Sequence, residues 1–133
     1  MERLNTAPHD AVTELLAALS VRSTVYCLSE LRAPWGFGVD GANVPKFHLV
    51  LAGSCWLSLA GHEPASLQAG DLVILSRGER HAMRDRPGSP VTNLDVIVAR
   101  HPLDPNARLT YGGAGPLTRL LCGGFVLDDP APP

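Results

Sequence analysis

Two histidines and a lysine stand where strand alternation would bring them into one pocket. Lys46 and His48 are two residues apart in an apolar stretch, so a strand there places both side chains on the same face. His81 follows an apolar run and a turn centred on Gly78, and it begins the next strand-like stretch. Trp35 is a further candidate, because an aromatic ring with one N–H donor suits a ligand pocket as well as a core. We therefore expect His48, His81, Trp35 and Lys46 to form a ligand-binding site.

The two histidines are open to three roles: metal coordination, hydrogen bonding to a ligand or to each other, and purely structural burial. A transition-metal site for Zn, Fe, Mn or Ni needs three or four ligands, so His48 and His81 alone make a weak one. Asp40, Cys55 and Cys122 are candidates for a third ligand, although no spacing requires any of them. No cofactor is certain at this stage, and no nucleophile motif or phosphate loop is present in the sequence.

Composition limits the classes of function. The chain has 133 residues, enough for one domain, which we place at 1–127, with a Pro-rich tail or the start of a linker at 128–133. Eleven basic and 13 acidic residues give a net charge of −2, which provides no electrostatic surface for nucleic acid or an anionic membrane. No apolar run approaches a membrane span and no signal peptide is evident, so a cytoplasmic location is expected. Three widely separated cysteines argue against a disulfide framework.

The distribution of apolar residues predicts an all-β chain with one N-terminal α-helix. Asp10 caps a stretch in which Val12, Leu15, Leu16 and Leu19 form one helical stripe, and we expect that stripe to pack outside the barrel. Beyond it, short apolar runs bounded by glycine and proline are typical of a sandwich or barrel. The predicted strands are 23–29, 37–39, 46–51, 55–59, 71–75, 81–84, 94–98 and 117–127. Short turns between neighbours predict antiparallel pairing, which gives a meander or jelly roll of two antiparallel sheets.

One segment, 111–116, has three glycines and a proline in six residues. Ordering such a segment is costly in conformational entropy unless the backbone has a specific requirement there. The segment is interpreted either as a flexible surface loop or as a lid or rim over the pocket.

The segment 70–81 resembles the second signature of the cupin superfamily, G-x5-P-x-G-x2-H. Ser76 stands where that signature usually has proline, Gly78 and His81 match it, and Asp85 stands where the motif often ends in asparagine. In the first signature of metal-binding cupins, Lys46 takes the position of the glutamate, and the chain reads Val-Asp-Gly-Ala where paired histidines would stand. The resemblance therefore implies that three of the four usual metal ligands are missing.

Four segments taken together, 29–36, 47–57, 70–81 and 112–123, are similar to the N-terminal cupin domain of AraC-type transcriptional regulators. This resemblance implies a cupin-type small barrel that binds a small-molecule effector and forms a homodimer, with DNA binding assigned to a separate domain outside this chain. We therefore expect a sensor domain that does not itself bind nucleic acid or membrane. The alternative is a small metal-dependent cupin enzyme, such as a dioxygenase, isomerase or cyclase, with His48 and His81 as metal ligands.

Overall fold

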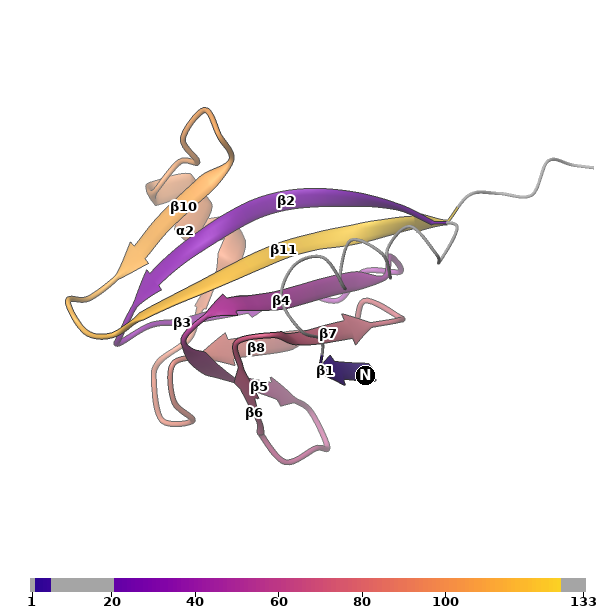
Figure 1. The fold of residues 1–133 in the computed structure, drawn as a ribbon, viewed down its shortest axis with the longest axis horizontal. Coiled ribbons are helices and arrows are strands. Elements are labelled where there is room, and N and C mark those ends of the chain that lie inside the picture. Colours follow the sequence, from indigo (N-terminus) through magenta and orange to yellow (C-terminus); the bar gives the residue numbers. More distant parts are fainter. Residues whose placement is uncertain (1, 6–20, 128–133) are drawn as a thin grey trace, which may run out of the picture.

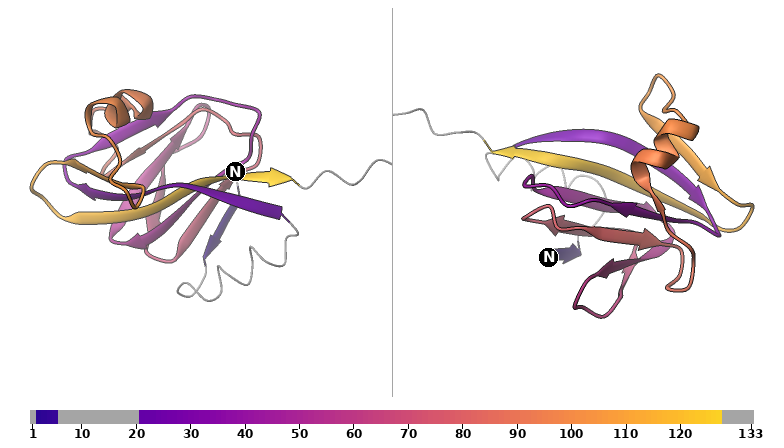
Figure 2. Two further views of the ribbon diagram at one scale, coloured as in Figure 1. Left: turned by 90° about the horizontal axis from the view of Figure 1, so that it is seen from above. Right: turned by 180° about the vertical axis from the view of Figure 1, so that it is seen from behind.

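The structure is a computed structural model that describes residues 2–5 and 21–127. In these residues the chain forms two β-sheets that face each other, with one short helix at one end of the sandwich (Figures 1 and 2). The all-β prediction is therefore confirmed. The predicted N-terminal helix with its stripe at Val12, Leu15, Leu16 and Leu19 lies outside the described residues.

The first sheet has six strands in the described part of the chain. Their spatial order is β1 (Glu2–Asn5), β7 (Asp71–Leu75), β4 (Lys46–Ala52), β11 (Leu117–Leu127), β2 (Val21–Arg32) and β10 (Arg108–Gly112). The second sheet has five, in the order β6 (Ala65–Gln68), β5 (Ser54–Leu59), β8 (His81–Arg84), β3 (Gly36–Val39) and β9 (Thr92–Asn93). Most neighbours are antiparallel as predicted, and parallel pairs occur at two edges, between β10 and β2 and between β3 and β9.

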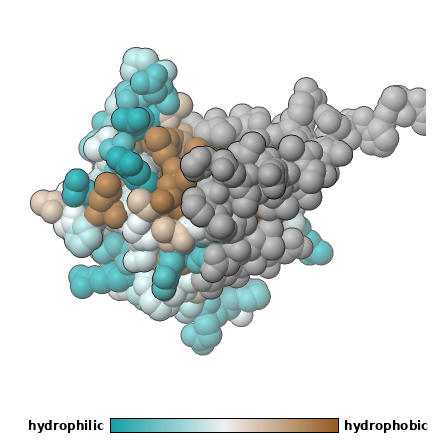
Figure 3. Space-filling view, viewed as in Figure 1, coloured by the Kyte–Doolittle hydropathy of each residue, from teal (hydrophilic) through white to brown (hydrophobic). Residues whose placement is uncertain are grey.

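Alternating side chains on the strands of the first sheet separate an inner core from an outer apolar face. Inward residues such as Val50, Val73 and Leu120 pack in the main core between the sheets. Phe47, Leu49 and Leu72 form a second cluster on the opposite face, with Ile74 and Leu121 packed against them. Figure 3 shows an apolar area on this side of the molecule. β4 thus has apolar side chains on both faces, Val50 toward the main core and Phe47 and Leu49 on the opposite face.

The predicted strand at 94–98 is wrong, because Leu94–Arg100 forms the helix α2. The run Val96-Ile97-Val98 favours a strand by its β-branched side chains, yet Leu94, Ile97 and Val98 also have the spacing of one helical face. Ile97 is buried and Val96 is 39% exposed, as expected of that face. Asn93 caps the helix, since its side chain accepts a hydrogen bond from the Asp95 N–H at 2.8 Å.

The glycine-rich segment crosses over the end of β2 as it connects β10 on one side to β11 on the other. Its backbone is held by that strand: the N–H of Gly113 donates to the Arg32 carbonyl, and the N–H of Gly115 donates to the Ala33 carbonyl, both at 2.8 Å. A Cβ on Gly113 or Gly115 would lie 2.7 Å from the Ala33 carbonyl oxygen. The glycines are therefore required by close backbone packing. Tyr111, Gly112 and Gly113 line a cleft on the outside of β2 and β10 together with Glu30 and Arg32.

None of the described helical segments is long and apolar enough to cross a membrane.

Candidate functional site

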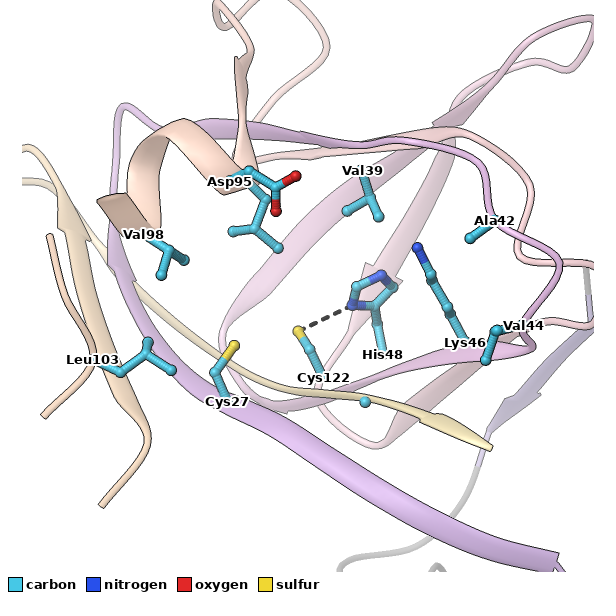
Figure 4. Close-up of a pocket in the computed structure, with 12 residues that line it drawn as sticks. Cys27, Val39, Ala42, Val44, Lys46, His48, Asp95, Val98, Leu103 and Cys122 are labelled. Carbon is cyan, nitrogen blue, oxygen red and sulfur yellow. Dashed lines mark hydrogen bonds between the residues drawn. The ribbon is translucent and has the colours of Figure 1, made fainter. Parts of the chain in front are cut away.

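A cavity of about 510 Å³ lies between the first sheet and the segment that carries β3 and α2 (Figure 4). Most of its lining is apolar and comes from Val39, Ala42, Val44, Leu94, Val98 and Leu103. Its polar side chains are those of Cys27, Lys46, His48, Asp95 and Cys122. A mostly apolar pocket with a few convergent polar groups is typical of sites for small organic ligands.

Strand β4 supplies Lys46 and His48, whose side chains point into the cavity as the two-residue spacing predicts (Figure 4). The Lys46 ammonium donates a hydrogen bond to the backbone carbonyl of Asp40 at 3.2 Å. Within the described part of the chain, Lys46 forms no ion pair with an acidic side chain. The pocket therefore presents a cation. A bound anion can neutralise its charge, and a carbonyl oxygen of a ligand can accept a hydrogen bond from it.

The turn between β7 and β8 supports the wall of the cavity next to Lys46. Gly78 has a φ of +61°, and a Cβ there would lie 2.1 Å from the Ala42 carbonyl oxygen and 2.3 Å from that of Val44. The Ala42 N–H donates to the Gly78 carbonyl at 3.0 Å. Glycine at this position in the signature thus allows the turn to contact the loop before β4 directly.

His48 and His81 come from different sheets and meet inside the sandwich. Their Nε2 atoms are 2.7 Å apart, and the Nδ1 of His48 is 3.0 Å from the Cys122 sulfur. The Nδ1–H of His81 donates to the Glu79 carbonyl at 2.8 Å, which leaves the Nε2 of a neutral His81 as an acceptor. The Nε2–H of His48 then donates to His81, and its Nδ1 accepts from the Cys122 thiol. The Glu79 carbonyl therefore determines the direction of each hydrogen bond in the series from His81 through His48 to Cys122.

Both histidines are held neutral. Burial lowers the pKa of His48 from 6.5 to about 3, and the repulsion that a protonated His81 would exert, together with the Lys46 charge, acts in the same direction. Burial also lowers the pKa of His81, against the effect of its hydrogen bond to the Glu79 carbonyl, and Lys46 lowers it further. Neutral imidazoles in this arrangement can accept and donate hydrogen bonds, and they add no positive charge to the one that Lys46 brings.

The site does not fit a cupin metal centre. Nowhere in the described part of the chain do three His, Cys, Asp or Glu side chains come together in a way that could hold a metal ion. Both ring nitrogens of His48 already have partners, and His81 lies behind it without lining the cavity. The lysine in the glutamate position is consistent with this difference, since a cation there opposes a divalent metal.

Trp35 is buried in the core and does not line the cavity. It is 3% exposed and stacks on Phe37 with ring centroids 5.9 Å apart, and Phe37 in turn contacts the His48 ring. Its backbone N–H donates to the Asp85 carboxylate at 3.1 Å, so the end of the second signature fixes the start of β3. Of the four predicted ligand-binding residues, Lys46 and His48 line the cavity, whereas His81 and Trp35 support it from behind.

Sequence reasoning named Cys122 only as a candidate metal ligand, and it missed the part of the lining that α2 and Cys27 supply. Leu94, Asp95 and Val98 reach the cavity only because 94–100 is a helix. The signal was present in the Asn93 cap, the acidic residue in the first turn and Arg100 in the last. Cys27 lies directly opposite Cys122 on the neighbouring strand, a pairing between residues 95 positions apart that no local pattern reveals.

Comparison with known proteins gives one family and one curated relative. The sequence matches a family described as Cupin over residues 10–133. It is 31% identical over 117 residues to a protein of Streptomyces lividans whose name describes it as an AraC-like transcription regulator. The match covers 87% of this chain and 37% of that protein, so the chain spans little more than a third of the relative's length. No solved structure matches significantly.

Proposed function

Because the chain belongs to the cupin family, and because the relative that it resembles is named as an AraC-like regulator, we propose that it is the effector-binding domain of an AraC-type transcriptional regulator. The domain binds a small molecule between its sheets and passes occupancy to a separate DNA-binding domain. The observation that supports this most is the cavity of about 510 Å³, which has the size and apolar lining of a small-molecule pocket.

The polar groups of the cavity suggest the chemistry of the effector. Lys46 is a cation in a partly desolvated pocket, where it stabilises an anionic group or a carbonyl oxygen more strongly than it would in water. The Val39, Leu94 and Val98 side chains opposite offer contacts to a hydrocarbon framework. The effector is therefore a mostly apolar molecule with one acidic or carbonyl group directed at Lys46.

Anilinonaphthalene sulfonate is a suitable probe, because it combines an aromatic framework with one negative charge. We expect saturable binding of one probe per chain, and roughly ten-fold weaker binding in Lys46→Met, which loses a charge-assisted contact. Uncharged anilinonaphthalene should bind both proteins equally. Equal loss for both probes would show that the variant disturbs the pocket as a whole and that Lys46 does not recognise the anion.

The absence of direct DNA binding is a further part of the proposal. The net charge of −2 provides no surface for a phosphate backbone, so the isolated chain should give no sequence-specific gel shift. A specific shift with these 133 residues alone would contradict the division between sensor and DNA-binding domains.

A further inference from the structure

Two cysteine thiols face the cavity as a directly opposed pair. Cys27 on β2 lies opposite Cys122 on β11, and Cys122 lies opposite His48 on β4, so the three side chains form a row across the floor of the pocket (Figure 4). Both thiols are free, and the Cys27 sulfur is 3.4 Å from the Ser29 hydroxyl oxygen. The row combines two thiols, a hydroxyl and an imidazole beside a cavity that admits a small molecule.

The two thiols differ in acidity. The pKa of Cys27 is lowered from 9.0 to about 6, chiefly by a hydrogen bond from Cys122, which acts against burial, and to a smaller extent by the Ser29 hydroxyl. The same interaction with Cys27 raises the pKa of Cys122 well above 9.0, and burial raises it too. The pair therefore loses its first proton from Cys27. The single proton of Cys122, which is donated to His48 Nδ1 while both thiols are neutral, turns to the Cys27 thiolate once that forms.

The remaining titratable groups around the cavity leave this order of ionisation intact. They are His48, Lys46 and Asp95, contributed by β4 and α2. His48 stays neutral because burial lowers its pKa to about 3. Lys46 brings a positive charge to the cavity, which favours a thiolate, and Asp95 brings a negative one, which opposes it.

We propose that Cys27 is a nucleophile that captures an α,β-unsaturated carbonyl compound inside the pocket, so that the domain can hold such an effector covalently. The inference deepens the proposed function and rests on it, since it names a chemical class for the molecule that the pocket binds. The apolar lining accommodates the carbon chain of the electrophile, and Lys46 is the cation available to its carbonyl oxygen.

The reaction is an addition that needs no oxidant or reductant. The Cys27 thiolate forms a carbon–sulfur bond with the β-carbon, and the π electrons of the carbon–carbon double bond move toward the carbonyl oxygen to give an enolate. The enolate then takes one proton at its α-carbon, which balances the proton that Cys27 released. The sum is one thiol and one unsaturated carbonyl compound giving one thioether. The Lys46 ammonium stabilises the negative charge that develops on the enolate oxygen.

Cys55 provides a matched control within the same chain. It is completely buried and does not line the cavity. Burial, with a smaller contribution from Asp71, raises its pKa to about 12. Cys55 is therefore a thiol that should stay unmodified as long as the fold is intact.

The test treats the folded protein with cyclohexenone and locates adducts by mass spectrometry of the intact chain and its peptides. We expect one adduct per chain, on Cys27, with a rate that rises about ten-fold from pH 5 to pH 7 and then levels off, as for a thiol of pKa near 6. Excess anilinonaphthalene sulfonate should slow the reaction. Cys27→Ser should abolish the adduct, Cys122→Ala should move the rise to higher pH, and Cys55→Ala should change neither.

Three results would overturn the inference: no adduct on Cys27, modification of Cys55 at the same rate, or a rate that still rises about ten-fold per unit above pH 7, as for an ordinary thiol. Peptide mapping and the pH profile use the unaltered protein, so they decide the matter even if a variant fails to fold. If the sulfonate probe binds the pocket while Cys27 stays unmodified, the covalent step alone is wrong. If the probe does not bind there, the proposed function fails first.

Discussion

Acid should destabilise this protein largely through one buried imidazole, His48. Its pKa is about 3 in the folded protein, against 6.5 for the solvated imidazole of an unfolded chain. The unfolded state thus binds a proton below pH 6.5 that the folded state does not accept, so stability is complete above that pH and decreases as the pH falls toward 3. Each pH unit in this window costs about 1.4 kcal/mol, which gives about 2.7 kcal/mol at pH 4.5 from His48 alone.

Urea unfolding at pH 7.5 and pH 4.5 measures this contribution when the protein is compared with His48→Gln. Glutamine can still donate and accept hydrogen bonds beside Cys122 and His81, but it does not titrate. On going from pH 7.5 to pH 4.5, the free energy of unfolding should therefore decrease in both proteins, and the decrease in His48→Gln should be about 2.7 kcal/mol smaller than in the unaltered protein. His62 lies exposed after β5, so His62→Gln should behave like the unaltered protein. An equal acid-induced loss of unfolding free energy in the unaltered protein and in His48→Gln would refute the conclusion that His48 is buried in its neutral form.

Three further predictions concern the turn, the lysine and the assembly. Gly78→Ala should destabilise the fold by roughly 2 kcal/mol more than Gly61→Ala in urea unfolding, because both glycines have positive φ but only Gly78 has backbone oxygens at the Cβ position. Lys46→Glu should gain zinc affinity by calorimetry and lose it again with His81→Ala; no gain would show that the carboxylate does not reach the histidines. Because β1, β10, β6 and β9 leave sheet edges in the described residues, light scattering should give about twice 14.1 kDa, and a concentration-independent monomer would contradict a homodimer.

The parts of the site that follow from local sequence were predictable. The spacing of Lys46 and His48 determines their common face, and the glycine turn at Gly78 starts the strand that carries His81. Both features depend on period-two alternation and on turn chemistry, which act over a few residues. The possibility that the two histidines bond to each other also followed, and the 2.7 Å separation of their Nε2 atoms agrees with it.

The parts that depend on long-range pairing were not predictable. The seven residues of α2 are too few to separate a helical from a strand period, so the β-branched run was assigned to the wrong element. The approach of Cys27 to Cys122 requires β2 and β11 to be neighbours, and the depth of Trp35 depends on how the second sheet covers it. Such contacts depend on topology, which one sequence does not specify.

The most direct test of the central claim, that the cavity between the sheets is the ligand site, fills that cavity from α2. Val98 lines it, whereas Val96 on the same helix is 39% exposed and does not. In a fluorescence titration with anilinonaphthalene sulfonate, Val98→Trp should weaken binding at least about ten-fold, and Val96→Trp should bind like the unaltered protein. Equal affinity in all three proteins, each unfolding cooperatively, would place the bound probe elsewhere and contradict the account.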